Sequence, residues 1–224
     1  MGQNLLQMLS LYQSFLCVII AYLLGSIPTS YLIGRIFFNT DIRQSGSGNT
    51  GATNALRSFG VKAGVTVLFI DVLKGVAAII IAQTLMKSVA NVSIIHLVVS
   101  ISGLAVILGH VFSIFLGFKG GKGVATAAGV FLALQPLTFL YCLVLFGFVV
   151  KVSQYVSLGS VLSAFAFMMI EIVTQVIMKF PNKPRLCLVI MVGILIIIRH
   201  KANLKRLLDG TENKIVFGKA KQAL

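Results

Sequence analysis

The sequence predicts an all-α integral membrane protein with seven transmembrane helices, and its composition and hydrophobic runs carry that prediction. Hydrophobic residues make up 58% of the 224 residues and charged residues 11%, against about 25% charged in a soluble domain. The mean hydropathy is +1.00, and successive apolar runs are long enough to cross a bilayer. The net charge of +14 is spread over the loops between these runs, which indicates a surface facing anionic lipid and anionic substrate rather than nucleic acid.

The apolar runs place the seven helices, in chain order, at 11–38, 62–86, 94–116, 122–134, 137–152, 158–178 and 186–199. The first run is interpreted as a retained span, because Met1–Ser10 contains no Lys or Arg and so lacks the basic region of a signal peptide. No linker, internal repeat or low-complexity segment is visible, which predicts a single domain over residues 1–224. Three cysteines are isolated in apolar runs and are expected to be small buried side chains rather than metal ligands or disulfides; they are Cys17, Cys142 and Cys187.

The fourth run, 122–134, is short for a membrane crossing. It rises about 20 Å, less than the ~30 Å hydrocarbon core, before Gln135-Pro136 interrupts it. The alternative is one kinked crossing over 122–152, which leaves six spans in total.

Charge counting favours seven spans, with the N-terminus outside and the C-terminus in the cytoplasm. In that arrangement the side with both polar loops and the C-terminal tail carries 14 Lys and Arg, and the opposite side carries four. With six spans the tally becomes nine against nine. Cytoplasmic loops carry an excess of Lys and Arg, so the uneven count is the expected one. A basic cluster on the outer side, Lys179–Arg185, is an exception to that rule.

Two polar loops interrupt the chain where apolar runs end: Ser45-Gly-Ser-Gly-Asn-Thr-Gly-Ala-Thr-Asn54 and Lys119-Gly-Gly-Lys-Gly-Val-Ala-Thr126. Glycines expose backbone N–H groups there, and hydroxyl, amide and basic side chains add donors that suit phosphate. A tight interfacial turn explains either loop alone, but two such loops on one face favour a binding site. Neither loop is a nucleotide motif, because no strand precedes the first and the P-loop pattern fails at Leu116 and Gly123.

A third polar element follows the last span and reads Arg199-His200-Lys-Ala-Asn203-Leu-Lys-Arg206. If the helix continues beyond the membrane, His200, Asn203 and Arg206 recur at i, i+3 and i+6 and share one face. The other basic side chains of this element are interpreted as anchors at the lipid headgroups; they are Arg199, Lys201 and Lys205.

Acidic side chains are few, and the whole chain has Asp41, Asp71, Glu171, Asp209 and Glu212. Asp71 and Lys74 lie one turn apart within a span, which predicts an intramembrane ion pair. Glu171 has no partner nearby in the sequence.

Taken together, these residues resemble those of a known family. The chain carries Gly25-Ser-Ile-Pro28, the two polar loops with Gly109-His-Val-Phe112 before the second, and the ending His200-x-x-Asn203-x-x-Arg206 with Gly210-x-Glu212. In this order, and on one expected side of the membrane, they resemble the bacterial acyl-phosphate:glycerol-3-phosphate acyltransferase family over almost the whole chain.

The resemblance implies a reaction and a location. A fatty acyl group passes from acyl phosphate to the 1-hydroxyl of glycerol 3-phosphate, giving lysophosphatidic acid and phosphate, the first acylation of bacterial phospholipid synthesis. The protein would be a multi-pass protein of the bacterial plasma membrane whose active site faces the cytoplasm. Its partners would be the two substrates, the lipid bilayer and the soluble enzyme that makes acyl phosphate, without nucleic acid, metal or cofactor.

The resemblance also implies residue roles. Catalytic or substrate-holding roles fall on Ser45, Ser47, Asn49, Arg57, His200 and Asn203. Substrate-binding roles fall on Thr53, Asn54, Lys119, Gly120, Gly121, Lys122 and Gly123, of which the last four form the site for the phosphate of glycerol 3-phosphate. Glu212 resembles a structural anchor.

The identity of the base stays open. Acyl phosphate is already activated, so the chemistry needs positioning and oxyanion stabilisation more than a covalent nucleophile. Side-chain candidates for the base are His110, His200 and Asp41, and the substrate's own phosphate, with a second pKa near 6, is the alternative acceptor. His110 is interpreted equally as a buried core residue or as a member of the site.

A function from another class is an anion or phosphorylated-solute transporter. It would place polar groups near the bilayer midplane on broken helices, often in paired halves. Here the polar motifs lie at span ends and no repeat is visible, so the sequence favours the acyltransferase.

Overall fold

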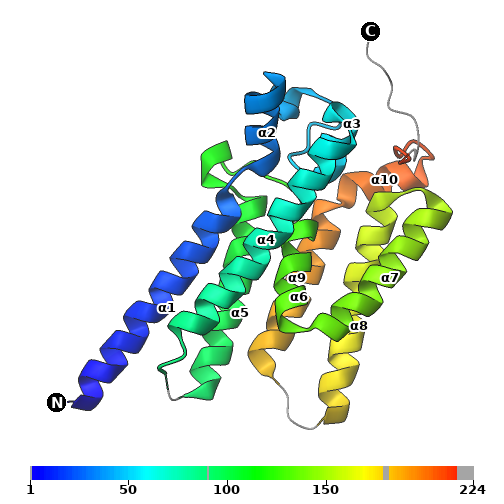
Figure 1. Cartoon of the computed structure of the whole chain (residues 1–224). Helices are drawn as coiled ribbons and strands as arrows, with labels where there is room; N and C mark the ends of the chain where they lie inside the picture. The colour runs from blue at the N-terminus through cyan, green and yellow to red at the C-terminus, as the bar shows by residue number, and fades with distance from the viewer. Residues whose placement is uncertain (1, 90, 179–181, 216–224) are drawn as a thin grey trace.

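The computed structural model describes residues 2–89, 91–178 and 182–215, and this part of the chain contains helices and no strand (Figure 1). The helices are α1 Gly2–Ser26, α2 Thr29–Phe38, α3 Ala52–Phe59, α4 Val61–Leu85, α5 Val92–Val111, α6 Val124–Leu134, α7 Pro136–Ser153, α8 Val156–Met178, α9 Lys183–Arg199 and α10 Lys201–Leu208, with 3-10 turns at Ile42–Gln44 and Ile114–Leu116. The all-α class is confirmed. Three basic residues that contribute to the charge counts on the two sides of the membrane lie outside the described residues; they are Lys179, Lys219 and Lys221.

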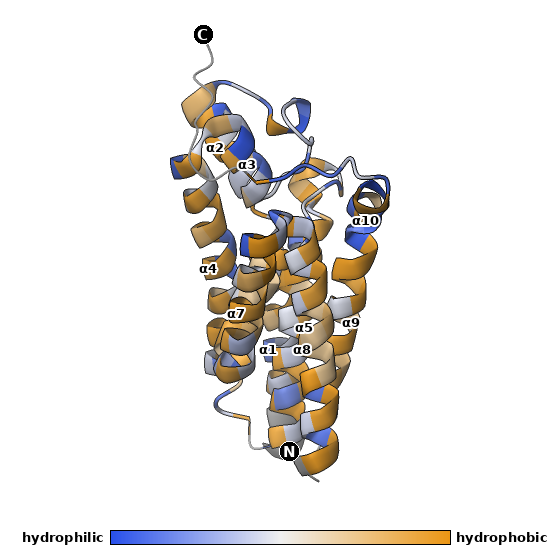
Figure 2. Cartoon of the chain, turned by 90° about the vertical axis from the view of Figure 1, so that its right-hand side faces the viewer, coloured by the Kyte–Doolittle hydropathy of each residue, from blue (hydrophilic) through white to orange (hydrophobic). Residues whose placement is uncertain are grey.

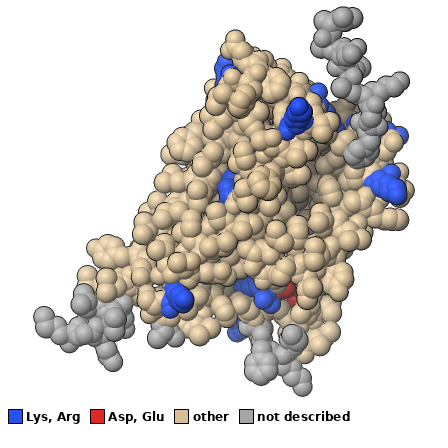
Figure 3. All heavy atoms as spheres, in the orientation of Figure 1, with Lys and Arg blue, Asp and Glu red and all other residues tan. Residues whose placement is uncertain are grey.

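The long helices carry the apolar surface that a membrane requires. Five segments of the described chain are long and apolar enough to cross a bilayer, namely Met8–Phe38, Val61–Leu85, Val92–Leu116, Pro136–Ser153 and Val156–Ile177. The bent pair α9 and α10 makes a sixth if it counts as one span, and α6 is a shorter apolar helix. Figure 2 shows apolar residues along these helices and polar residues concentrated near α3 and α10. On the face in Figure 3, basic side chains lie mainly toward the two ends.

Each predicted run is largely helix, but α5 ends at Val111, before the predicted end of the third run at 116, and two interruptions also differ from the expectation. The first run is divided into α1 and α2 by Ile27 and Pro28, because proline has no N–H to continue the α-helical ladder. The last run does not continue as a straight helix beyond the membrane, since α9 and α10 meet at His200 at an angle of 52°. His200 is the N-cap of α10, and His200, Asn203 and Arg206 still line one cavity despite the bend.

Helices α6 and α7 form a hairpin that begins and ends at the same end of the molecule (Figure 1). Just before α6, the Lys122 Nζ atom lies 2.6 Å from the Asn203 Oδ1 atom. Just after α7, the carbonyl of Gln154 accepts a hydrogen bond of 2.8 Å from the N–H of Ile215. Both partners belong to the C-terminal segment, so the chain turns back at Gln135. Helices α6 and α7 are therefore antiparallel neighbours rather than one kinked helix over 122–152.

The turn of that hairpin is fixed by a buried polar cluster around Glu171. The side-chain amides of Gln135 and Gln175 both donate to the Glu171 carboxylate. The Arg185 Nε atom lies 2.9 Å from Glu171 Oε1. Glu171 therefore has a partner from the outer basic cluster, which is close in space and distant in sequence.

A second buried polar cluster lies where α2, α4 and α5 meet. The Lys74 Nζ atom is 2.8 Å from Asp71 Oδ1, which confirms the predicted ion pair. Thr29 Oγ1 donates to the same oxygen at 2.9 Å, and Lys74 Nζ is 2.8 Å from His110 Nδ1. The charges are thus neutralised inside the helix bundle, as intramembrane ionisable groups require.

Glycines allow α6 to pack closely on α4 and so set the position of the loop that precedes α6. A Cβ atom on Gly75 would collide with the carbonyl oxygen of Thr126, and one on Gly129 with that of Val72. Such contacts between small residues are typical of helix packing in membranes, where backbones approach closely.

The cysteines follow the expectation only in part. Cys17 and Cys142 are buried, but Cys187 is exposed on α9. An outward-facing side chain of a spanning helix meets hydrocarbon rather than water, so an apolar thiol is tolerated there.

Candidate active site

A cavity of about 620 Å³ joins all three polar elements of the sequence. Its polar wall includes the loop before α3, the start of α6 and the junction of α9 with α10. Its apolar wall continues between α4, α6, α7, α8 and α9. The predicted site residues that line it are Ser47, Asn49, Thr53, Asn54, Arg57, His110, Lys122, Gly123, His200, Asn203 and Glu212. The structure does not bring Asp41, Ser45, Lys119, Gly120 or Gly121 into this wall.

The loop before α3 is organised around Asn54. The Asn54 Oδ1 atom accepts from the N–H of Ser47 at 2.8 Å. The Nδ2 atom donates to the carbonyls of Ile42, Ser45 and Asn49 at 3.3, 3.0 and 2.9 Å. Asn54 is 2% exposed, so its amide is fully used in shaping the loop. The hydroxyls of Ser47 and Thr53, by contrast, have no hydrogen-bond partner among the described residues.

Asp41 faces away from the cavity and caps the 3-10 turn at Ile42–Gln44. Its carboxylate accepts from the backbone N–H of Arg43 at 3.0 Å and from the Arg43 Nη2 atom at 2.6 Å. Arg35 adds a contact of 3.5 Å. The hydrogen bond from the Arg43 side chain lowers the pKa of Asp41 to about 2, so this carboxylate is a poor proton acceptor at neutral pH.

The second loop presents fewer free backbone donors than its glycines suggest. The N–H groups of Gly120 and Gly121 donate at 3.0 Å to the carbonyls of Val111 and His110, at the end of α5. Lys119 is exposed. The donors that remain are the Lys122 side chain and the N–H groups in the first turn of α6, which have no acceptor within the helix. The expectation that the N–H groups of both Gly120 and Gly121 are open is thus corrected.

Lys122 is connected to the third element by a chain of polar contacts. Lys122 Nζ donates to Asn203 Oδ1 at 2.6 Å, and Asn203 Nδ2 donates to Glu212 Oε1 at 2.6 Å. Ser157 Oγ also donates to Glu212 Oε1, at 2.8 Å, and Arg206 Nε donates to Oε2 at 2.8 Å. Glu212 therefore holds α8, α10 and the second loop together.

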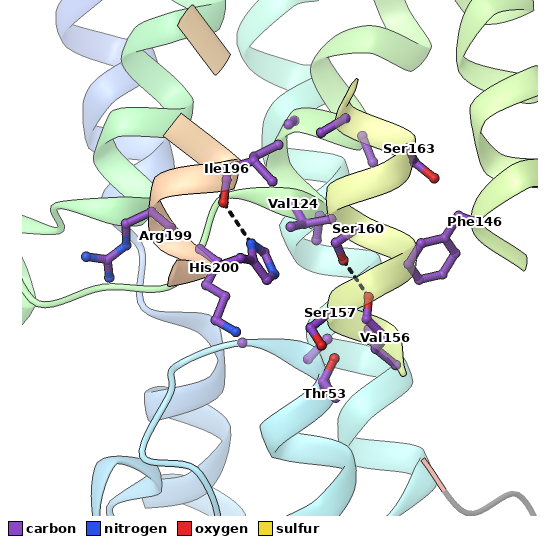
Figure 4. A pocket seen from close by; sticks show the side chains of 18 of the residues that line it. Thr53, Val124, Phe146, Val156, Ser157, Ser160, Ser163, Ile196, Arg199 and His200 are labelled. Carbon is purple, nitrogen blue, oxygen red and sulfur yellow. Dashed lines mark hydrogen bonds between the residues drawn. The ribbon is translucent and has the colours of Figure 1, made fainter. Parts of the chain in front are cut away.

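His200 lies at the bend between α9 and α10, and its ring projects into the cavity with Ser157 and Thr53 (Figure 4). Its Nδ1 atom is 2.8 Å from the carbonyl of Ile196, so Nδ1 carries the proton and Nε2 is a hydrogen-bond acceptor. Burial, followed by the nearby charge of Lys122, lowers the pKa of His200 to about 4. The imidazole is therefore neutral at physiological pH.

The electrostatics of the polar wall favour an anion. Four basic side chains line it with Glu212 nearby, and they are Arg57, Lys122, Arg199 and Arg206. Burial, together with the charges of Arg206, Arg57 and Arg199 and against the opposing charge of Glu212, lowers the pKa of Lys122 to about 8. An incoming dianion would relieve this repulsion, because opposite charge favours the protonated amine.

A family model described as glycerol-3-phosphate acyltransferase matches residues 15–210. The chain belongs to this family. It is 43% identical over 203 residues to "Glycerol-3-phosphate acyltransferase 2" of Bacillus anthracis, covering 91% of this chain and 100% of the relative. Crystal structures of PlsY (YgiH), described as an integral membrane glycerol 3-phosphate acyltransferase, are similar as well. The glycerol 3-phosphate form has a TM-score of 0.81 at 38% identity, covering 91% of this chain and 96% of that one. The lysophosphatidic acid form has a TM-score of 0.77 at 37% identity, covering 91% and 95%.

In this member of the glycerol-3-phosphate acyltransferase family, the His110 side chain packs against the second loop at Gly121. Its Nδ1 atom faces Lys74 at 2.8 Å, and a Cβ atom on Gly121 would collide with its ring. Gly121 is therefore required for the loop to lie against His110. His110 is both buried, at 8% exposure, and part of the cavity wall.

Sequence reasoning missed Ser157 and misassigned Arg199. Ser157 stands alone at the start of a predicted span, and its only signal is a polar residue at a helix end. Arg199, interpreted as a headgroup anchor, instead donates through Nη2 to the carbonyls of Gly120 and Gly121 at 3.4 and 3.2 Å. Its proximity to the loop depends on tertiary packing, which no local pattern encodes.

Proposed function

We propose that this protein transfers a fatty acyl group from acyl phosphate to the 1-hydroxyl of glycerol 3-phosphate, giving lysophosphatidic acid and phosphate. The observation that carries the proposal is one cavity with a basic, donor-rich wall at one end and an apolar wall below it. A phosphorylated head and a hydrocarbon tail need those two environments side by side. The protein would thereby carry out the first acylation step of phospholipid synthesis.

The apolar part of the cavity suits the acyl chain. On α8 the wall runs from Val156 to Phe167, a rise of about 16 Å; it carries the hydroxyls of Ser157, Ser160 and Ser163 before it becomes apolar at Ala164 and Phe167. The rise is comparable to one leaflet of a hydrocarbon core ~30 Å thick. A substrate can therefore keep its carbonyl near the polar loops while its tail remains in an apolar environment.

The basic part of the cavity suits two phosphate groups. Lys122, with the first turn of α6, holds the phosphate of glycerol 3-phosphate, because a helix N-terminus and an ammonium both favour an anion. Arg57 donates to Asn213 O at 2.9 Å and lines the same cavity as Ser47, Asn49 and Thr53, and with them it holds the second phosphate. The remaining loop residues, Ser45, Asn54, Gly120 and Gly121, act by shaping the two loops.

The reaction needs one proton transfer. The 1-hydroxyl oxygen attacks the acyl carbonyl, the bond from that carbon to the phosphate oxygen breaks, and the hydroxyl proton passes to a phosphate. His200 positions the 1-hydroxyl of glycerol 3-phosphate through its Nε2 acceptor. Asn203 fixes the Lys122 side chain by bonding to both Lys122 and Glu212. The phosphate of the substrate accepts the proton, since its second pKa near 6 leaves it dianionic at neutral pH.

The proposal includes seven spans with the site facing the cytoplasm. Helices α1, α4, α5, α6, α7, α8 and α9 run along the bundle in alternating directions, and α1 begins at the end opposite α10 (Figure 1). The excess of Lys and Arg on the side of the polar loops supports a cytoplasmic assignment. Reporters fused after residue 181 and after Lys214 are expected in opposite compartments. Both reporters in one compartment would contradict the proposal.

The function is tested with purified protein in detergent, supplied with palmitoyl phosphate and glycerol 3-phosphate. We expect lysophosphatidic acid and inorganic phosphate to form in equal amounts. Phosphate release without lysophosphatidic acid would identify a hydrolase and overturn the proposal. An anion transporter is the less suitable alternative, because the cavity is closed at its apolar end by aromatic side chains.

A further inference from the structure

The deep end of the cavity is a layer of large apolar side chains. The deepest wall residue on each helix is Phe131 on α6, Phe139 on α7, Phe167 on α8 and Val189 on α9. The rings of Phe131 and Phe167 are stacked, with centroids 4.4 Å apart and planes inclined by 29°. Both side chains are buried, at 7% and 6% exposure. The stacked pair therefore closes the space between α6 and α8.

One helical turn beyond this layer lies the polar cluster around Glu171. Gln135 follows Phe131 by four residues, Glu171 follows Phe167 by four, and Arg185 precedes Val189 by four, a step of about 6 Å in each helix. Glu171 accepts from Gln135 and Gln175 and is paired with Arg185 at 2.9 Å. A hydrocarbon chain extending past the aromatic layer would have to displace the partners of Glu171, which is 1% exposed, and a buried carboxylate without partners is strongly unfavourable.

We infer that Phe131 and Phe167 set the longest acyl chain that the enzyme accepts, and that the Glu171 cluster prevents a longer chain from extending past these two side chains. The inference rests on the proposed function, because it requires the acyl chain to occupy the apolar part of the cavity. Selectivity arises by exclusion. The alternative environment of the acyl chain is bilayer hydrocarbon, so burial in the cavity adds little binding free energy. A chain whose terminal carbons would overlap the stacked rings is excluded.

The test supplies purified protein with an equimolar mixture of acyl phosphates from lauroyl to behenoyl and glycerol 3-phosphate, and mass spectrometry measures each lysophosphatidic acid. Phe131→Ala and Phe167→Ala are expected to raise the ratio of the longest to the palmitoyl product by about tenfold, the effect typical of one methylene in an apolar pocket. Ala164→Phe, which narrows the wall one turn above Phe167, is expected to shift the products toward shorter chains. Phe165→Ala is the matched control, because Phe165 is 50% exposed on the same helix, and its profile should equal that of the wild type.

An unchanged product profile in both alanine variants, with turnover retained, would overturn the inference. If these variants do not fold, Phe167→Leu and Ala164→Phe decide it by the same ratio, and opposite shifts are required. Wild-type protein that makes no lysophosphatidic acid from any donor would instead overturn the proposed function. Total product and product distribution thus separate the two failures.

Discussion

The Lys122 ammonium lies 2.6 Å from the Asn203 amide oxygen, across 81 residues of sequence. This contact joins the loop before α6 to the helix after the last span. The same Asn203 donates to Glu212, so the position of Lys122 at the proposed phosphate site depends on the C-terminal segment. The binding site is therefore a product of tertiary structure, although each of its parts is a local motif.

The first prediction concerns the phosphate contact of Lys122. Lys122→Ala should raise KM for glycerol 3-phosphate roughly 10- to 150-fold, because a charge-assisted hydrogen bond contributes about 1.5–3 kcal/mol. KM for acyl phosphate should change far less. Lys119→Ala is the matched control, since Lys119 is in the same loop but exposed and outside the cavity wall. Equal effects of Lys122→Ala on both substrates would indicate a structural role in the turn.

The second prediction follows from the pKa of Lys122, which burial and neighbouring cations lower to about 8. The charged amine binds phosphate, so kcat/KM for glycerol 3-phosphate should fall as the pH rises through about 8 in the free enzyme. Bound dianion raises this pKa, so kcat should fall only at higher pH. Lys122→Arg keeps its charge and should lose the alkaline fall in kcat/KM. A fall that persists unchanged in this variant would assign it to another group.

The third prediction separates His200 from the substrate as proton acceptor. The pKa of His200 is lowered to about 4, whereas the second pKa of a phosphate monoester is near 6. If the phosphate is the acceptor, kcat falls below about pH 6 in the wild type and in His200→Asn alike. His200→Asn should lower kcat by no more than about a hundredfold, the low end of the range for a general base.

The same kcat profiles are measured for His110→Asn and Asp41→Asn. A variant that loses more than about a thousandfold and also loses the acidic limb would identify its residue as the base. Substrate assistance would then be wrong.

The fourth prediction distinguishes loop shape from substrate contact at two adjacent residues. Asn54→Ala removes one acceptor and a donor that reaches three carbonyls, so the apparent Tm should fall by roughly 3–10 °C together with turnover. Thr53→Ala removes a hydroxyl without a partner in the described structure and should lower turnover while leaving Tm unchanged. Thermal unfolding in detergent and initial rates provide both readouts. A lowered Tm in Thr53→Ala only would reverse the two assignments.

Most of the long helices could be predicted to within a few residues because the chain alternates long apolar runs with polar loops, but α1 begins nine residues before its predicted start and the short helix α3 lies within a predicted loop region. The sequence does not predict the break at Pro28 or the bend at His200, since hydrophobicity continues across the first and no proline or glycine marks the second. The ion pair of Asp71 with Lys74 follows from helical spacing. The partners of Glu171 do not, because Gln135 and Arg185 reach it from other helices.

The site was predicted as three motifs on one face, and the structure places parts of all three in one cavity. Composition does not show which backbone N–H groups of the loops are available to bind a ligand. Gly120 and Gly121 have the right residue type for a phosphate loop, but their N–H groups are bonded to the end of α5. Ser157 carries no motif, and only the tertiary structure brings it into the cavity wall and into contact with Glu212.

The measurement that tests the proposed chemistry most directly compares two donors. Purified protein is given glycerol 3-phosphate with either palmitoyl phosphate or palmitoyl-CoA, and lysophosphatidic acid is followed over time. The polar wall of the cavity lies within a few residues of the membrane-spanning helices, and the described chain offers no separate domain that could hold the nucleotide of CoA. We therefore expect turnover with palmitoyl phosphate and none with palmitoyl-CoA. Comparable rates with the two donors would contradict an acyl phosphate-specific transferase.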